Sequence, residues 1–526
     1  MAIKIPKALN PFIQPLIALL AGMIFPLGFA PFDYAVACFA SIIIFLYLLH
    51  NKKPKASFLI GWLYGIGLFA IGGSWIFVSI HIYGETPIWL AGLLTSIFVL
   101  ALGVFYGAIA ALTTYLFPNT NLIRTLVGFP IIWVILEIVR GWFLTGFPWL
   151  YAGYSQLSTH LQALAPIGSV WAVSWAVLLT SGILFHFMFY YQNKMASARI
   201  RNTLLLSFAS LWLGCYALNK QDLLQSTTVC HPEKSLQVAL IQSNTPQEYK
   251  WQSEHRQEIA DQLSELTIAS IQNHADLVIW PEAAMPVPLP YSADYFSKLN
   301  AQAKANNIGI IASAPIEFNK APNGMPADIS YTNSLLGLGA ASGIYNKQHL
   351  VPFGEYVPLE KWLRGLIKFF DLPMSNMSAS QNAAEDQNQL FIGKNWKIAP
   401  AICYEIAYPI LVRDRVKPDT DFILTVSNDT WFGKSIGPYQ HMQIAQMRAL
   451  ETGRYLVRAT NTGFTAIVAP KGNVISVAPQ FERFIQTGQI LACENQTLWV
   501  RFGIAPLFIL LGLGLLFAFY FDNKKK

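Results

Sequence analysis

The sequence has little charge. Aspartate, glutamate, lysine and arginine make up 12% of its 526 residues, whereas a soluble globular protein carries about 25%. Hydrophobic residues make up 54%, and the mean hydropathy is positive. This composition excludes an ordinary soluble globule and indicates that much of the chain lies in lipid. The net charge of +7 is modest and no nucleic-acid-binding motif is present, so we expect no nucleic-acid partner.

Cysteine is also scarce, with five residues whose spacing fits no zinc motif. We expect no metal and no soluble cofactor. Cys38 and Cys215 lie in apolar stretches and are interpreted as core residues. Cys230 and Cys493 bracket the polar part of the chain near its two ends. Two alternatives remain for them, free thiols or a disulfide if that part lies outside the cytoplasm.

Long apolar segments dominate the two ends of the chain. Because about twenty apolar residues cross a bilayer, we predict about eight transmembrane helices, the first of them uncleaved. The predicted spans are 11–32, 34–50, 57–81, 87–117, 122–140, 166–191, 202–219 and 498–521. With eight spans, the basic residues beside them fall on one side, which is the cytoplasmic side by the positive-inside rule. These residues are Lys4, Lys7, Lys52, Lys53, Lys55, Arg124, Lys194, Arg199, Arg201 and Lys524 to Lys526.

The domain prediction follows from this pattern. Residues 1–219 are predicted to hold transmembrane helices one to seven, and residues 498–526 the last helix and a basic cytoplasmic tail. Residues 220–497 then lie outside the cytoplasm. Short apolar runs alternate there with amphipathic stretches, a pattern typical of α/β layers. We expect strands near 236–242, 277–280, 308–313, 332–339, 343–346, 397–402, 422–426, 455–460, 464–469 and 473–477, and helices near 253–273, 293–306 and 439–453.

Three chemical groups stand at the ends of predicted strands. Cys403 follows the run 398–402, Glu282 follows 277–280 and Lys347 follows 343–346. A helix opening after Cys403 would lower the thiol's pKa towards the thiolate, which suits a nucleophile. The alternative for Cys403 is a small core residue. Glu282 has an alternative as a helix N-cap acid, and Lys347 as a surface lysine.

The sequence motifs around these residues resemble those of a known enzyme superfamily. Residues 235–495 resemble the nitrilase (carbon-nitrogen hydrolase) superfamily. The resemblance rests on three motifs: Trp280-Pro281-Glu282, the stretch from Lys347 to Glu355 with Leu350-Val351-Pro352-Phe353-Gly354, and Cys403-Tyr404-Glu405. With the apolar segments, the whole chain resembles the apolipoprotein N-acyltransferase family of bacterial lipoprotein maturation. The resemblance implies an extracytoplasmic αββα sandwich joined to a polytopic α-helical membrane domain. It also implies a catalytic domain in the periplasm and a bacterial inner membrane protein.

The same resemblance implies roles for single residues. Glu282 would be the base, Lys347 the oxyanion stabiliser and Cys403 the nucleophile. Glu355 and Glu405 would support the triad by holding Lys347 charged, and Tyr404 would support it through the backbone N–H that follows Cys403. Further residues are candidates for lipid binding, with packing as their alternative: Trp251, Trp431, Phe432 and Trp149.

The implied reaction moves an acyl chain from the sn-1 position of a phospholipid to Cys403 and then to the α-amino group of a diacylglyceryl-cysteine apolipoprotein. The expected partners are therefore a phospholipid, an apolipoprotein and the bilayer, and we expect a monomer. A membrane-anchored amidase with the same triad is one alternative. A non-enzymatic transporter or sensor is another, although the intact triad argues against it. Glu137 and Arg140 are either a self-neutralising pair or functional intramembrane charges.

Overall fold

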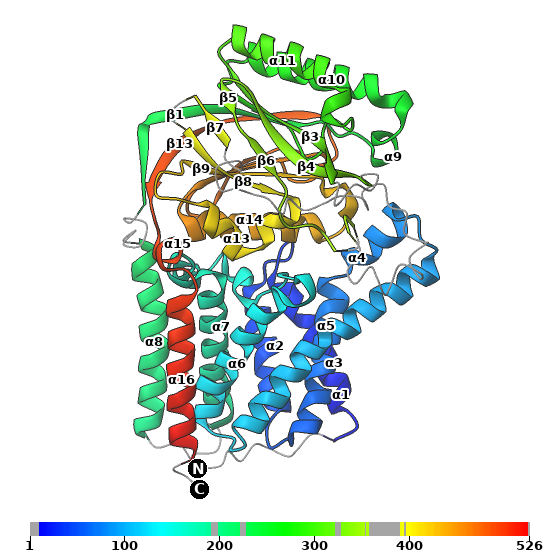
Figure 1. Ribbon diagram of the computed structural model, residues 1–526. Helices are drawn as coiled ribbons and strands as arrows, with labels where there is room; N and C mark the ends of the chain where they lie inside the picture. The colour runs from blue at the N-terminus through cyan, green and yellow to red at the C-terminus, as the bar shows by residue number, and fades with distance from the viewer. Residues whose placement is uncertain are drawn as a thin grey trace. The chain divides into compact units, whose positions relative to one another are not determined.

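The computed structural model describes residues 10–190, 198–220, 228–320, 328–352, 354–356, 390–393 and 396–523. Two compact units make up the chain, and their elements are labelled in Figure 1. Unit 1 contains Met1–Ser226, Lys434–Gln443 and Arg501–Lys526, and unit 2 contains Thr227–Gly433 and Ile444–Val500. The predictions for Lys4, Lys7, Lys194 and Lys524 to Lys526 concern residues outside the described ones.

Unit 1 is helical. Each of the predicted spans contains a helix, because long apolar runs satisfy their backbone hydrogen bonds internally only as helices. The helices are α1 (Gln14–Ile24), α2 (Ala35–Leu48), α3 (Pro54–Gly72), α4 (Trp75–Val78), α5 (Ile88–Leu116), α6 (Phe129–Arg140), α7 (Ala165–Tyr190), α8 (Ala198–Lys220) and α16 (Ala505–Asn523). Short 3₁₀ segments join them at η1 (Phe25–Gly28), η4 (Phe143–Thr145), η5 (Ala152–Gln156) and η6 (His160–Leu164), and π-helical turns at η2 (Ser79–Tyr83) and η3 (Arg124–Gly128).

Among the described residues of this unit, three helices are long and apolar enough to cross a membrane by length and composition. They cover Pro54–Gly72, Ile88–Leu116 and His160–Phe189. Shorter apolar helices lie at Gln14–Gly28, Ala35–Leu48 and Ala505–Phe521. The prediction of one continuous helix over 57–81 is wrong, because α3 ends at Gly72 and a turn separates it from α4. The Gly72-Gly73 pair explains this break, since glycine is a poor helix former.

A glycine allows α1 and α3 to approach closely. A side chain at Gly22 of α1 would collide with the backbone carbonyl of Tyr64 on α3. Small residues at such crossings let helices pack by van der Waals contact, which drives helix association in lipid.

Glu137 and Arg140 of α6 are both held by hydrogen bonds to a neighbouring segment of backbone. Both are 2% exposed, and both form hydrogen bonds to segment 147–152. The two groups also interact electrostatically with each other. Glu137 Oε1 accepts from the Trp133 indole at 2.9 Å and from the backbone N–H of Ala152 at 2.8 Å. Arg140 Nη1 donates to the carbonyl oxygens of Phe147 at 2.9 Å and Trp149 at 2.6 Å. The two charges therefore hold an irregular segment of backbone in place.

The described residues of unit 2 form two β-sheets. The first has the strand order β13-β1-β2-β3-β4-β6, and the second β12-β11-β10-β9-β8-β7-β5. The strands are β1 (Thr228–Gln242), β2 (Leu277–Ile279), β3 (Gly309–Lys320), β4 (Asp328–Gly339), β5 (Ala341–Ser342), β6 (Ile344–Asn346), β7 (Leu390–Ile392), β8 (Trp396–Ile402), β9 (Phe422–Ser427), β10 (Tyr455–Thr460), β11 (Ala466–Val468), β12 (Val474–Val477) and β13 (Phe484–Asn495).

Helices complete this unit. They are α9 (Gln247–Lys250), α10 (Arg256–Gln272), α11 (Ala293–Ala305), α13 (Pro409–Arg415) and α14 (Gly437–Thr452), with the second half of α14 in unit 2. Short helical turns lie at η9 (Ser253–His255), η10 (Leu289–Tyr291), η12 (Cys403–Ala407) and η13 (Asp429–Phe432). The unit ends at Val500, within α15 (Leu498–Phe502). The sequence prediction missed β5, β7, β13 and α9. The helix expected to open after Cys403 is the turn η12 followed by α13.

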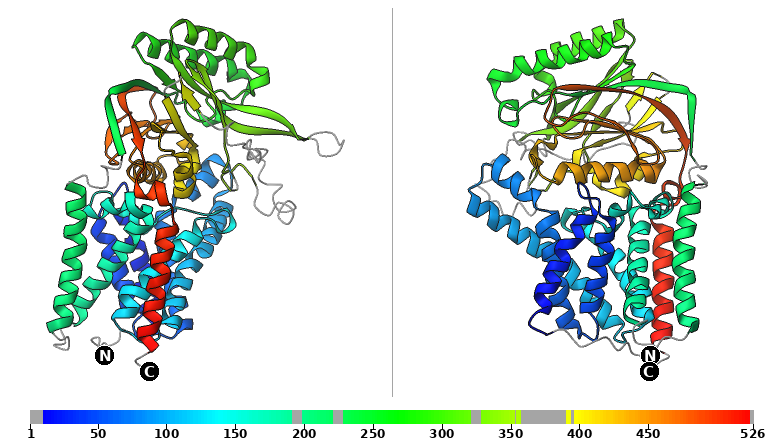
Figure 2. Two further views of the ribbon diagram at one scale, coloured as in Figure 1. Left: turned by 60° about the vertical axis from the view of Figure 1, so that its left-hand side comes forward. Right: turned by 180° about the vertical axis from the view of Figure 1, so that it is seen from behind.

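The alternation of residues along the strands builds two cores. Val238 and Leu240 of β1 join residues of the second sheet, such as Leu424, in a core between the sheets. Ala239 and Ile241 point the other way and pack with α10 and α11. Successive side chains of a strand face opposite sides, so one strand serves both cores. Helices α10 and α11 lie together against the first sheet in both views of Figure 2. Two packed sheets with a helical layer over the first agree with part of the expected αββα sandwich.

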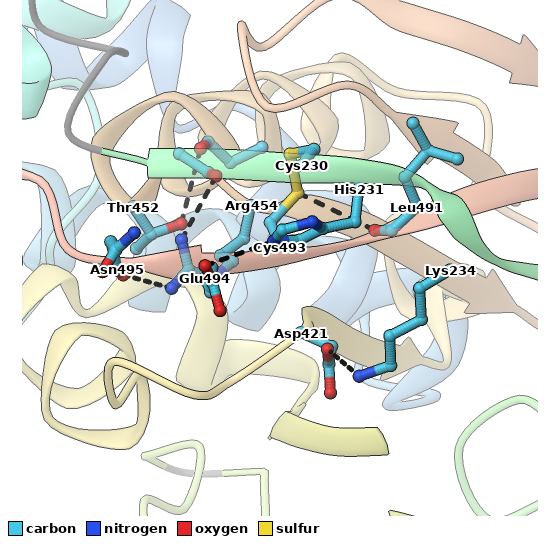
Figure 3. The surroundings of a disulfide bond; sticks show 12 residues. Cys230, His231, Lys234, Asp421, Thr452, Arg454, Leu491, Cys493, Glu494 and Asn495 are labelled. Carbon is cyan, nitrogen blue, oxygen red and sulfur yellow. Dashed lines mark hydrogen bonds and ion pairs between the residues drawn. A yellow bond between two sulfur atoms is a disulfide. The ribbon is translucent and has the colours of Figure 1, made fainter. Parts of the chain in front are cut away.

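A disulfide joins Cys230 and Cys493, which resolves the alternatives for these cysteines. The two residues face each other in the antiparallel pair of β1 and β13 (Figure 3). Arg454 lies beside them and donates to the backbone oxygen of Asn495 at the end of β13. The bond therefore fastens the first and last strands of unit 2 to each other near the ends where the chain enters and leaves the sandwich.

Candidate active site

Strand ends bring the predicted catalytic residues together. Lys347 follows β6 and Cys403 follows β8 directly, while Glu282 lies three residues beyond β2. β8 and β9 are parallel, and the carboxyl ends of parallel strands meet at one edge of a sheet, where sites commonly form. Asn428, which follows β9, reaches the same place.

Lys347 is the centre of a buried cluster. Its side chain is 0% exposed, and its ammonium donates to Glu355 Oε1 at 2.8 Å and to Glu282 Oε1 at 3.1 Å. Burial acts to lower the pKa of Lys347, but the carboxylates of Glu282 and Glu355 outweigh it and hold this pKa well above its usual value. Lys347 is therefore a permanent cation rather than a surface lysine. Two of its three N–H bonds are used, which leaves one for another acceptor.

Glu282 is fixed at both carboxylate oxygens. Oε1 accepts from Lys347 and from Asn333 Nδ2 at 2.7 Å, and Oε2 accepts from the backbone N–H of Asn428 at 2.8 Å. The next residue, Ala283, has a left-handed φ of 46° and donates its N–H to Ser313 Oγ at 2.8 Å. Glu282 thus sits in a strained turn and not at a helix N-terminus. Backbone strain of this kind collects at functional sites.

Cys403 begins η12 and is itself strained, with a φ of 54°. Its residue is partly exposed, whereas Glu282 and Lys347 are buried. Burial of the sulfur raises the pKa of Cys403, Glu282 raises it further, and Lys347 opposes both. The expectation of a lowered pKa is wrong, because desolvation of a thiolate outweighs the effect of a short helical turn. These electrostatic interactions also show that all three predicted residues lie near one another.

Glu355 and Glu405 support different parts of the site. Glu355 Oε1 bonds to Lys347, and its Oε2 accepts the N–H of Val351 at 2.8 Å. Burial raises the pKa of Glu355 and Lys347 opposes that rise. Glu405 does not hold Lys347, so that expectation is wrong.

The carboxylate of Glu405 instead joins the two loops of the site. It accepts from the backbone N–H of Gln348 at 2.8 Å and of Ile402 at 2.8 Å, the neighbours of Lys347 and Cys403. Arg415 forms an ion pair with this carboxylate at 3.1 Å, and the Tyr345 hydroxyl donates to it at 2.7 Å. Burial acts to raise the pKa of Glu405, but Arg415 outweighs it and the pKa lies below its usual value. Tyr404 is buried with its ring edge-on to that of Tyr408 at 5.2 Å.

The aromatic lipid-binding candidates lie in different surroundings. Trp251 is half-buried and packs with Leu350, close after Lys347. Trp431 and Phe432 are half-buried in η13, a turn that Asp429 anchors through an ion pair with Arg458 at 2.7 Å. For these three the lipid role stays a prediction.

Trp149 belongs to unit 1, where its ring is buried. It is 1% exposed, and its indole donates to Gln440 Oε1 at 2.7 Å in the same unit. Its ring also packs against Trp75 with ring centres 5.3 Å apart. The lipid-binding role of Trp149 stays a prediction, and Arg140 holds the backbone of the segment that carries it.

Several polar residues of the site escaped the sequence prediction. Asn333, Asn428 and Lys250 all contact Glu282. Single asparagines and lysines in polar stretches give no periodic signal, so only the fold identifies them. Among the residues that the structure describes, no group of three or more histidine, cysteine or acidic side chains is placed to hold a metal ion.

Comparison with known proteins agrees with this geometry. Residues 237–492 match the family described as Carbon-nitrogen hydrolase, and residues 21–183 match the Apolipoprotein N-acyltransferase N-terminal domain. Unit 2 is thus a carbon-nitrogen hydrolase domain.

Relatives of similar length complete the comparison. The apolipoprotein N-acyltransferase of Azotobacter vinelandii is 40% identical over 95% of this chain and 94% of its own length. That of Pseudomonas syringae pv. tomato is 41% identical over 94% of each chain. That of Pseudomonas aeruginosa strain PAO1 is 38% identical over 96% of this chain and 95% of its own. The chain belongs to the apolipoprotein N-acyltransferase family.

Proposed function

We propose that the protein carries out the family's lipoprotein N-acylation through a thioester on Cys403, with Glu282 as base and Lys347 as oxyanion stabiliser. The acyl donor is the sn-1 ester of a membrane phospholipid. The acceptor is the α-amino group of the N-terminal diacylglyceryl-cysteine of an apolipoprotein. The observation that carries the proposal is the buried cluster in which Lys347 bonds to Glu282 and interacts with Cys403.

The first half-reaction loads the enzyme. Glu282 takes the proton of Cys403, and the thiolate attacks the ester carbonyl carbon to form a tetrahedral oxyanion. The remaining N–H of Lys347 and the backbone N–H of Tyr404 donate to that oxygen. The bond to the glycerol oxygen then breaks, Glu282 returns its proton to this oxygen, and a lysophospholipid leaves. The acyl chain stays on the sulfur as a thioester.

The second half-reaction transfers the chain. The neutral amine of the apolipoprotein attacks the thioester carbonyl, and Glu282 takes the amine's proton. The carbon–sulfur bond breaks as the amide forms, and the proton on Glu282 restores the thiol. A thioester suits both steps, because it stores the acyl group and reacts readily with an amine. The residues of the site perform both steps with one base.

We also propose that eight helices of unit 1 cross the bacterial inner membrane and that unit 2 is periplasmic. The apolar helices support a membrane location. The Cys230–Cys493 disulfide supports an oxidising compartment for unit 2. The boundaries 1–219, 220–497 and 498–526 are proposed as the division between membrane and periplasmic parts.

The experiment separates this function from a membrane-anchored amidase. Full-length protein in detergent is incubated with phospholipid, and its intact mass is measured. We expect an added fatty-acyl mass that hydroxylamine removes and that is absent in Cys403→Ser. A diacylated lipopeptide then takes up the chain as an amide. Release of free fatty acid without amide formation, or no mass gain in the wild type, would exclude the acyl-transfer function.

A further inference from the structure

Lys250 is a buried lysine in the site that the mechanism above does not use. It ends α9, its side chain belongs to a residue 2% exposed, and its ammonium donates to the backbone oxygen of Glu282 at 3.1 Å. A lysine is almost never fully buried unless its charge is paired. This one interacts electrostatically with both Glu282 and Cys403.

Helix α9 is tied to Glu282 by a second route. Gln247 Oε1 accepts from Asn428 Nδ2 at 2.8 Å, and the backbone N–H of Asn428 donates to Glu282 Oε2 at 2.8 Å. Glu282 is therefore held at its main chain by Lys250 and at its carboxylate by Asn428, which Gln247 steadies. Both routes start from the first turn after β1.

The charges of the cluster give Lys250 a second effect. Glu282 and Glu355 are two acids, and Lys347 neutralises only one of them. Protonated Lys250 balances the other, and it favours the negative charge that develops when Cys403 ionises. Burial lowers the pKa of Lys250 to about 8, against the opposing influence of Glu282 and Cys403. Glu248 on the same helix is exposed.

We propose that Lys250 is a positioning residue for acyl transfer: it fixes the turn of Glu282, and its positive charge promotes the thiolate of Cys403. The inference rests on the proposed roles of Glu282 and Cys403. It does not require Lys250 to touch the substrate. The direction of the effect of Lys250 on Cys403 is defined. Loss of the positive charge makes the thiol less reactive below about pH 8 and leaves its reactivity little changed well above that pH.

The test measures how fast iodoacetamide alkylates Cys403 between pH 6.5 and pH 10, roughly the range over which a group with this pKa titrates. Full-length protein in detergent is used, and the Cys403 peptide is quantified by mass spectrometry. The variants are Lys250→Met, which removes the charge and the hydrogen bond, and Lys250→Arg, which keeps the charge. Lys298→Met on α11 is the matched control, because Lys298 is exposed.

We expect Lys250→Met to be alkylated about tenfold more slowly than wild type at pH 7, the effect of roughly one pKa unit on the thiol. The ratio of the two rates should approach one by about pH 10, where wild-type Lys250 is neutral. A ratio independent of pH would mean a merely structural role and would overturn the inference.

Lys250→Arg provides a second measurement if Lys250→Met folds poorly. Its charge persists at high pH, so it should be alkylated faster than wild type at pH 10 and at a similar rate at pH 7. Identical profiles for wild type and Lys250→Arg would also overturn the inference. Alkylation needs no lipid, so failure of the acyl-transfer assay with these alkylation results intact counts only against the proposed function.

Discussion

Replacing Lys347 with methionine removes a buried cation and leaves a side chain of similar length. Glu282 and Glu355 then face each other across the space the ammonium occupied, with no cation between them. Glu282 keeps its bonds from Asn333 and Asn428, and Glu355 keeps the bond from Val351. The variant therefore isolates the loss of one charge within a site whose other contacts are intact.

The expected cost follows from these contacts. Breaking a buried ion pair by removing one partner costs about 3–5 kcal/mol. Because each carboxylate keeps backbone or amide donors, and because burial already raises the pKa of Glu355 so that it can take up a proton, we expect the lower end, about 3 kcal/mol. For a domain of this size, each kcal/mol shifts the unfolding midpoint by about 2–4 °C, so the midpoint should fall by roughly 6–12 °C.

The assay is thermal unfolding of full-length protein in detergent at one heating rate, followed by tryptophan fluorescence, since unfolding of such proteins is often irreversible. Exposed Lys304 on α11 provides the control, and Lys304→Met should change stability by no more than about 0.5 kcal/mol. The double variant Lys347→Met/Glu355→Gln should be more stable than the sum of the single effects, because it removes one of the stranded acids. A fall below about 2 °C for Lys347→Met would refute the charge argument.

Two further predictions concern stability. Arg415 holds the pKa of Glu405 low against burial, so the stability this carboxylate gives is complete above about pH 5 and is lost as the pH falls through the lowered folded-state pKa. The unfolding midpoint of Glu405→Gln should therefore decline less steeply than that of wild type between about pH 5 and pH 3, and equal slopes would contradict this. Cys230→Ser should lose about 2–4 kcal/mol of stability, and reduction should lower the midpoint of wild type but not of the variant.

Much of the sandwich could be predicted from local pattern. Buried parallel strands read as apolar runs, so the predicted 422–426 and 455–460 nearly match β9 and β10. β13 escaped because its polar residues occupy both faces: Thr487 and Gln489 are exposed on one side, and Gln486 is buried on the other. The strand therefore shows no clean alternation of polar and apolar residues. β5 and β7 escaped because strands of two and three residues carry too little signal.

In the candidate site, too, some residues could be predicted from local sequence pattern and others could not. Glu282, Lys347 and Cys403 could be found because each stands at the end of a recognisable strand. Lys250 and Glu405 could not be assigned their parts, since their partners lie far away in sequence. Glu405 bonds to the N–H of Gln348, 57 positions away, and Lys250 to the carbonyl of Glu282, 32 positions away. The pairing of charged groups therefore depends on contacts that form only in the folded protein.

The raised pKa of Cys403 has a consequence for how such an enzyme works. A sulfur that stays protonated at rest reacts slowly with oxidants, because the thiolate is the reactive form. This matters where a disulfide can form, as at Cys230 and Cys493. In the proposed mechanism Glu282 takes the proton, and a thiolate of high pKa is then the stronger nucleophile, since nucleophilicity rises with pKa. Under the proposed roles, the thiol would be unreactive at rest and strongly nucleophilic at the moment of attack. Glu282 as base and Lys250 as a nearby positive charge would then be needed, because a thiol with a raised pKa does not ionise by itself.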